Sequence, residues 1–183
     1  MNLVTILYFV GAGFLAINLQ IAYQFFKFTR QRQSALLTWD PPRPPLYRLF
    51  LWVGALLGLE IIYKLAVLHM TLNNVFGETM LLIYYVYTLP LSLKIRRGFY
   101  QDGIWTDGAY ISYANIGGLT WREGESLTLI LLQRWRNFAR RLTVPTPLYG
   151  EARRVLRDKI AAHDIHFTGK ALDLGLHDER DDA

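Results

Sequence analysis

Residues 49–70 read LFLWVGALLGLEIIYKLAVLHM, and this stretch decides the fold class. It is mostly apolar, and about 20 such residues are enough to cross the hydrocarbon core of a bilayer as a helix. Two further apolar runs flank it, at about residues 3–26 and 75–93. The sequence therefore predicts an α-helical membrane anchor with three transmembrane helices within residues 1–95.

Charged residues around the apolar runs predict how the chain crosses the membrane. The loop after residue 70, TLNNVFGE, has no positive charge, whereas basic residues follow the first and third runs directly. They are Lys27, Arg30 and Arg32, then Lys94, Arg96 and Arg97. Lysine and arginine gather on the cytoplasmic side. We expect the N-terminus outside and everything after the third span in the cytoplasm, and the uncharged start MNLVTILYF favours a retained helix over a cleaved signal peptide.

Glu60 and Lys64 are the acidic residue and the lysine of the second apolar run. They are four residues apart, so a helix places them on one face in the favourable Glu-before-Lys order. An ionisable group inside a membrane is costly and usually faces the protein interior. Three interpretations stay open: an internal ion pair that fixes packing, a site that handles protons or ions, or a contact with a partner subunit's helix.

Other residues of the anchor are candidates for helix packing or an intramembrane polar site. Asn18 interrupts the first run, where an amide either hydrogen-bonds a neighbouring helix or lines a pore. Gly54 and Gly58 form a GxxxG pattern that permits close helix approach. Tyr84, with two tyrosines after it, could donate a phenol hydrogen bond toward the Glu60 face.

A proline-rich connector joins the first two spans. Prolines 41, 42, 44 and 45 cannot continue a helix and favour an extended segment. Trp39 and Tyr47 flank it, and tryptophan and tyrosine are enriched at the lipid headgroups. We expect a stiff connector with interfacial aromatic anchors.

After residue 96 the pattern changes to short strands. Asp102-Gly103 and Asp107-Gly108 are turn signals. Leucines alternate in the longest apolar strand, residues 127–135, and Thr146-Pro147 signals the start of a helix whose apolar stripe runs to Ile160. The expected strands are 98–101, 104–106, 109–113, 115–122, 127–135 and 140–144. Residues 96–165 are therefore predicted to form a small α+β domain, closed by one helix, and the acidic segment 166–183 is predicted to be disordered.

The run GFYQDGIWTDGAYISYANIGGLTWREGESLTLIL (residues 98–131), followed by LTVP and a final helix, resembles the small PH-like domain of a family of bacterial membrane proteins of unknown function. The shared pattern is a glycine-initiated strand, the segment ISYANI, a tryptophan strand, an alternating strand and a C-terminal helix. The resemblance covers about residues 96–165. It implies a multi-pass protein of the bacterial inner membrane with a cytoplasmic PH-like domain, and it supplies no catalytic residues.

Arginines are the candidate binding residues of this domain, and they gather around one hairpin and one helix. They are Arg134, Arg136, Arg140, Arg141, Arg153, Arg154 and Arg157. Near an anionic leaflet each basic group contributes roughly 1 kcal/mol of attraction. The alternatives are docking on lipid headgroups, a solvated surface, or contact with an acidic protein.

Several function classes are disfavoured. The chain has no cysteine, which excludes disulfides, thiolate metal sites and cysteine nucleophiles, and only four histidines. No phosphate-binding loop, nucleophile elbow or metal-ligand spacing occurs, so we expect no enzyme, no cofactor and no bound metal, and the anchor disfavours nucleic-acid binding. The sequence favours an accessory subunit or scaffold that binds membrane lipids and other membrane subunits or copies of itself. The alternative is a small oligomeric transport or proton-linked protein that uses Glu60 and Lys64.

Overall fold

The computed structural model describes residues 3–122, 127–134 and 139–165. The chain divides into two compact units, and each is considered by itself. The first contains residues 1–30 and 41–95, and the second contains residues 31–40 and 96–183. The sequence places residues 31–40 in the anchor, whereas the structure groups them with the β-sheets. The predicted disorder of residues 166–183 falls outside the described residues.

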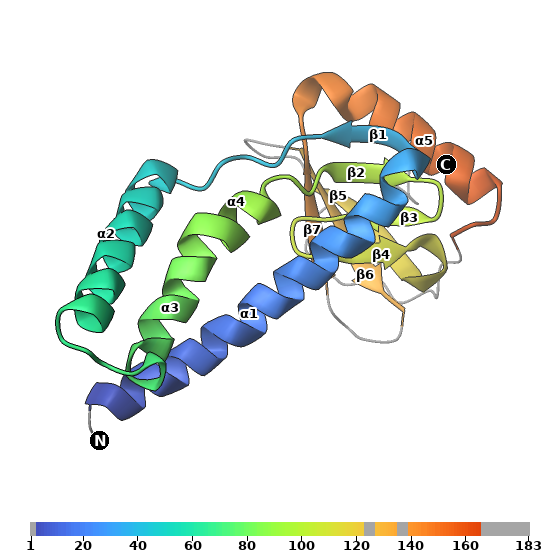
Figure 1. The fold of residues 1–183 in the computed structure, drawn as a ribbon. Helices are drawn as coiled ribbons and strands as arrows, with labels where there is room; N and C mark the ends of the chain where they lie inside the picture. The colour runs from blue at the N-terminus through green and yellow to red at the C-terminus, as the bar shows by residue number, and fades with distance from the viewer. Residues whose placement is uncertain (1–2, 123–126, 135–138, 166–183) are drawn as a thin grey trace. The chain divides into compact units, whose positions relative to one another are not determined.

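Helical elements make up most of the first unit (Figure 1). Helix α1 spans Leu3–Gln31 and α2 spans Tyr47–Ala66. The third apolar run forms α3 (Phe76–Ile83), the π-helix η3 (Tyr84–Thr88) and α4 (Leu89–Ser92). Helix α3 runs beside α2 after a loop that contains the 3-10 turn η2 (Leu72–Val75).

The π-helix explains how the third run accommodates Pro90. Proline has no backbone N–H, and its ring clashes with the carbonyl four residues earlier in an α-helix. Here the chain widens just before the proline, and the N–H of Leu89 bonds to the carbonyl of Tyr84, five residues back. π-turns of this kind are uncommon insertions within helices. The helix therefore widens into a π-turn next to Pro90.

Two helices, α1 and α2, are long and apolar enough to cross a membrane. Only 11% of the tested window of each helix is buried inside the structure. A core helix of a water-soluble protein would be mostly covered, whereas these helices expose much of their apolar surface. The third run is divided among α3, η3 and α4, and it does not form a single helix of spanning length.

Two antiparallel sheets and one helix form the second unit. The first sheet has the order β1-β2-β3-β4 and the second has the order β5-β6-β7. The strands are β1 (Ala35–Trp39), β2 (Arg97–Tyr100), β3 (Gly103–Trp105), β4 (Tyr110–Ser112), β5 (Ile116–Arg122), β6 (Leu127–Gln133) and β7 (Ala139–Val144). Short 3-10 turns η1 (Arg32–Ser34), η4 (Tyr113–Asn115) and η5 (Thr146–Leu148) join elements.

The core of this unit lies between the two sheets and helix α5 (Tyr149–Ala161). Alternation along β6 turns Leu129 and Leu131 inward, where both are fully buried. Helix α5 adds Ala152 and Leu156 to the same cluster. The helix begins later than predicted, because Thr146-Pro147 forms the turn η5 without a side-chain cap.

Strand β1 corrects the interpretation of Trp39 as a headgroup anchor. Trp39 is paired with Arg97 across β1 and β2. Its indole nitrogen donates a 3.1 Å hydrogen bond to the carbonyl of Thr143 on β7, and its ring lies 6.2 Å from that of Phe99. Trp39 therefore belongs to the β-sheet unit and links its two sheets.

Candidate functional site

An ionic cluster joins α2 and α3 within the helical unit. The Nζ atom of Lys64 lies 2.6 Å from Glu60 Oε1 and 2.9 Å from Glu78 Oε1. Glu60 is one turn before Lys64 on α2, whereas Glu78 comes from the first turn of α3. Lys64 lies in the last turn of α2, so both Lys64 and Glu78 stand at the helix end whose dipole favours their charge. One ammonium group therefore closes the helical hairpin through two carboxylates.

Exposure decreases across the cluster. The side chain of Glu60 is 48% exposed, that of Lys64 23% and that of Glu78 7%. The Oε2 atom of Glu78 is buried, and no hydrogen-bond partner for it occurs among the described residues. Leaving a buried acceptor unsatisfied costs about 1–3 kcal/mol, and more for a charged group. The helix dipole at the start of α3 offsets about 0.3–1 kcal/mol of this cost.

Glu78 is the member of the cluster that sequence reasoning missed. Glu60 and Lys64 share a helix, so their spacing reveals the pair, whereas Glu78 meets Lys64 only because the loop folds α3 back on α2. A signal did exist: an acidic residue near the start of an apolar span is a candidate functional group by itself.

Asn18 connects α1 to α3. Its Nδ2 atom donates a 3.1 Å hydrogen bond to the carbonyl of Met80, while its Oδ1 atom is buried without a partner among the described residues. The two helices approach closely at Gly77, where a Cβ atom would lie 2.4 Å from the carbonyl oxygen of Leu7. Asn18 is thus part of a helix contact within one chain.

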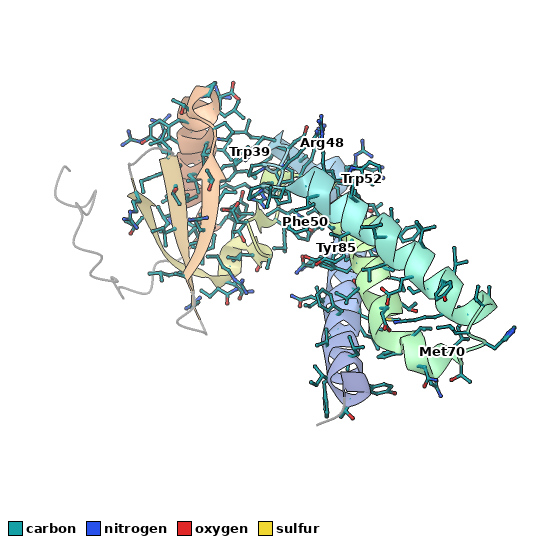
Figure 2. The ribbon with its side chains drawn as sticks, turned by 90° about the vertical axis from the view of Figure 1, so that its left-hand side faces the viewer. Trp39, Arg48, Phe50, Trp52, Met70 and Tyr85 are labelled. Carbon is teal, nitrogen blue, oxygen red and sulfur yellow. The ribbon has the colours of Figure 1, made fainter. Side chains whose placement is uncertain are left out.

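The GxxxG glycines of α2 face the third helical run. A Cβ atom on Gly54 would lie 2.8 Å from Val86 Cγ2, whereas one on Gly58 would lie 3.6 Å from Leu82, an ordinary contact. Close to Gly54, Phe50 stacks on Tyr85 with ring centroids 5.6 Å apart (Figure 2). Only Gly54 is therefore required for the close approach.

Tyr84 does not join the ionic cluster. Its ring lies edge-on to Phe14 and Tyr85, at 5.1 and 5.3 Å between centroids. In the described part of the chain no tyrosine hydroxyl bonds to Glu60. Aromatic packing holds the ring of Tyr84 against Phe14 of α1, and the phenol donor stays a prediction.

The candidate arginines that the structure describes differ in their surroundings. Arg140 and Arg141 are adjacent on β7, so their side chains leave opposite faces of the strand. The Nε atom of Arg141 lies 3.6 Å from Asp107 Oδ2, and Arg97 pairs with the same carboxylate. Thr143 also donates to Asp107, at 3.2 Å. Arg141 is therefore part of a local ion-pair network.

The remaining arginines differ in exposure. The helix α5 residues Arg153, Arg154 and Arg157 are exposed, as is Arg134 after β6. Arg136 lies outside the described residues. Lys159 of α5 is engaged, because its Nζ atom donates to the carbonyl of Gln101 and pairs with Asp164, each at 2.9 Å. Helix α5 thus presents the principal described group of exposed arginines.

Buried tyrosines are the perturbed titratable groups of the β-sheet unit. Burial raises the pKa of Tyr100 from 10.0 to about 12, and the positive charge of Arg96 partly opposes this shift. Burial also raises the pKa of Tyr113, whose hydroxyl donates a 2.9 Å hydrogen bond to the carbonyl of Tyr100. Both phenols stay protonated near neutral pH and act as structural donors.

Among the described residues, no group of three or more histidine, cysteine, aspartate or glutamate side chains could hold a metal ion. No known protein family, no curated protein and no solved structure matches the chain. The functional conclusions below therefore depend on the geometry of this chain alone.

Proposed function

We propose that this protein is a non-enzymatic, three-span protein of a bacterial inner membrane that presents a PH-like domain at the cytoplasmic surface. Its role is that of an accessory subunit or scaffold. The elements that carry this role are the helices of the first unit, which anchor the chain, and the β-sheet unit, which faces the cytoplasm.

Exposed apolar side chains on α1 and α2 support the membrane location. Phe9 on α1 is 68% exposed, and Trp52 and Leu56 on α2 are 71% and 63% exposed. Figure 2 shows Trp52 pointing away from the helical unit. Contiguous apolar surface of this extent typically contacts lipid or another protein.

The pairing of β1 with β2 is the single observation that carries the three-span topology. The chain leaves the β-sheet unit after residue 40 and returns at residue 96, beside the strand it left. If α2 crosses the bilayer, residues 67–95 must cross back. Elements α3, η3 and α4 cover residues 76–92, which at 1.5 Å per residue is about 25 Å, close to the thickness of the hydrocarbon core.

Strand β1 also supports the PH-like assignment of the β-sheet unit. With β1, the first sheet has four antiparallel strands and the second sheet has three, and helix α5 follows them. Two packed antiparallel sheets closed by a C-terminal helix are what a PH-like sandwich requires. The exposed arginines of α5 favour anionic lipid headgroups or an acidic subunit as the surface it contacts.

Single-cysteine labelling tests the topology directly, because the native chain contains no cysteine. Asn73→Cys lies in the loop between α2 and α3, and Ala161→Cys lies at the end of α5; both positions are exposed. An impermeant maleimide added to intact cells should label Asn73→Cys, and it should label Ala161→Cys only after permeabilisation. Labelling of Ala161→Cys in intact cells, or protein that stays soluble without detergent, would overturn the topology.

Lipid contact by α5 has its own test. In nanodiscs, anionic lipid should slow maleimide labelling of Ala161→Cys relative to zwitterionic lipid. Replacing Arg153, Arg154 and Arg157 by glutamine should remove the difference, whereas the matched change Arg134→Gln should keep most of it. Equal labelling rates in both lipids would rule out headgroup docking by this helix.

A proton-linked transport protein is the second candidate function, and the position of Glu78 favours it. A third ionisable group joins Glu60 and Lys64, and it is nearly buried. Glu60→Gln separates the two functions: lost flux in reconstituted vesicles supports transport, whereas lost assembly without a flux defect supports the scaffold.

A further inference from the structure

The ionic cluster between α2 and α3 carries an unbalanced charge. Two carboxylates contact one ammonium group, so the three side chains carry a net charge of −1 when all are ionised. Lys64 satisfies one oxygen of Glu78, Oε1, and leaves the buried Oε2 without a donor among the described residues. A buried, unpaired anionic oxygen is unfavourable, and protonation relieves this cost.

Among the described residues, the one ion pair that Glu78 forms is with Lys64. Helix α2 contributes Lys64 and Glu60. On α1, residues 3–26 contain no charged side chain or histidine, and Tyr8 packs on the ring of Phe76 beside Glu78. In η3, Tyr84 and Tyr85 contact aromatic rings, and Tyr87 is exposed.

A proton fits this site better than a metal ion does. Metal ions such as Ca²⁺ and Mg²⁺ take six or more oxygen ligands, and they need several carboxylates or waters. The described residues contain no such group, and the Oε2 atom of Glu78 is buried. A proton needs only one oxygen atom.

We propose that the Glu60–Lys64–Glu78 cluster binds one exchangeable proton, held on Oε2 of Glu78. With Glu78 neutral, Lys64 and Glu60 form a balanced ion pair at 2.6 Å, and Oε1 of Glu78 still accepts a hydrogen bond from Lys64. Half-exposed Glu60 marks the side from which water reaches the cluster. This proton site lies in the membrane only if α2 and α3 cross it, which is part of the proposed function.

Infrared difference spectroscopy of the full chain in lipid nanodiscs tests this site. Between alkaline and mildly acidic pH, the native chain should gain a carboxylic-acid C=O band that shifts in D₂O. Glu78→Gln should lose this band. Glu60→Gln should weaken it, because Lys64 then balances the charge of Glu78, although Oε2 still has no partner among the described residues. The matched control Glu151→Gln, at an exposed position on α5, should keep it.

Conservative variants assign the proton even where glutamine at position 78 prevents folding. Glu78→Asp should move the band, because the frequency depends on the acid that carries the proton, and Glu60→Asp should leave it in place. A native chain without the band, a band retained in Glu78→Gln, or a band moved by Glu60→Asp would each overturn the assignment. Cysteine labelling at positions 73 and 161 reports topology separately, so the two proposals fail independently.

Discussion

Trp39 of β1 lies beside Arg97 of β2, although the entire segment from α2 to α4 separates the two residues in the chain. The same tryptophan bonds to Thr143 of β7, so one side chain links the two sheets. The β-sheet unit therefore closes only when the chain returns to it after residues 41–95. Pairing between distant strands forms late, because closing the long loop costs entropy first.

Trp39→Ala should destabilise the β-sheet unit by about 2 kcal/mol. The change removes a hydrogen bond and much of the packing against Phe99. Resistance of residues 96–165 to brief proteolysis across a urea series measures the loss. Trp52→Ala is the control, since Trp52 is exposed on α2 and should alter this resistance by less than about 0.5 kcal/mol. Equal effects of the two substitutions would mean that Trp39 does not link the sheets.

Gly98→Ala should weaken the pairing of β1 with β2. Gly98 has φ of +131°, and a Cβ atom there would lie 2.1 Å from the carbonyl oxygen of Leu37. Strain of this kind and the displacement of β1 should together cost at least about 2 kcal/mol. Gly150→Ala has open space on α5 and should be neutral or stabilise by up to about 1 kcal/mol. Thermal unfolding in detergent compares them, and a Gly98→Ala protein as stable as the native chain would contradict the register.

The strands after residue 96 could be predicted from their local sequence patterns. Strand β1 could not, because its partner strand β2 lies far away in the sequence. The alternating leucines of β6 and the Asp-Gly turns define strands without knowledge of their partners. Residues 35–39 carry no comparable signal beside a proline-rich segment, and their partner strand begins at Arg97. The coarse fold class, helices plus a small α+β unit, agrees with the structure. Three membrane crossings remain a proposal.

In the candidate site, too, the contact within one helix could be predicted from the sequence, and the contact between two helices could not. Glu60 and Lys64 are visible as a helical pair, whereas Glu78 depends on how the hairpin closes. Arg140 and Arg141 are neighbours in the sequence, but adjacent residues of a strand point to opposite faces. The structure assigns Arg141 to Asp107 and leaves the arginines of α5 exposed.

Gly77→Ala should separate α1 from α3. The added methyl group would lie 2.4 Å from the carbonyl oxygen of Leu7, which is backbone and cannot rotate away. Overpacking of this kind costs about 1–3 kcal/mol, so the melting temperature in detergent should fall. Gly13→Ala, also in the helical unit, meets nothing within 4 Å and should be neutral. If Gly13→Ala lowers the melting temperature as much, the close contact does not occur at Gly77.

Tyr100→Phe should make the β-sheet unit less sensitive to alkaline pH. Tyr100 ionises with a pKa near 10.0 in the unfolded chain, whereas burial raises its pKa to about 12 in the folded protein. Between these two pH values the unfolded state binds fewer protons than the folded state, so stability falls as pH rises. The contribution is fully present below pH 10 and is lost as pH approaches 12, and two pKa units correspond to roughly 3 kcal/mol.

The variant should therefore show a stability curve that crosses that of the native chain. Near neutral pH, Tyr100→Phe lacks the 3.2 Å hydrogen bond from the hydroxyl to the carbonyl of Arg96 and should be about 1 kcal/mol less stable. Above pH 10 the native chain loses the contribution of Tyr100 and the variant does not, so their difference should shrink and reverse. Urea unfolding at a series of pH values measures the difference in unfolding free energy between the two proteins. Tyr113 keeps its raised pKa in both proteins, so some alkaline sensitivity persists, and a difference that does not change with pH would show that Tyr100 is not buried as a neutral phenol.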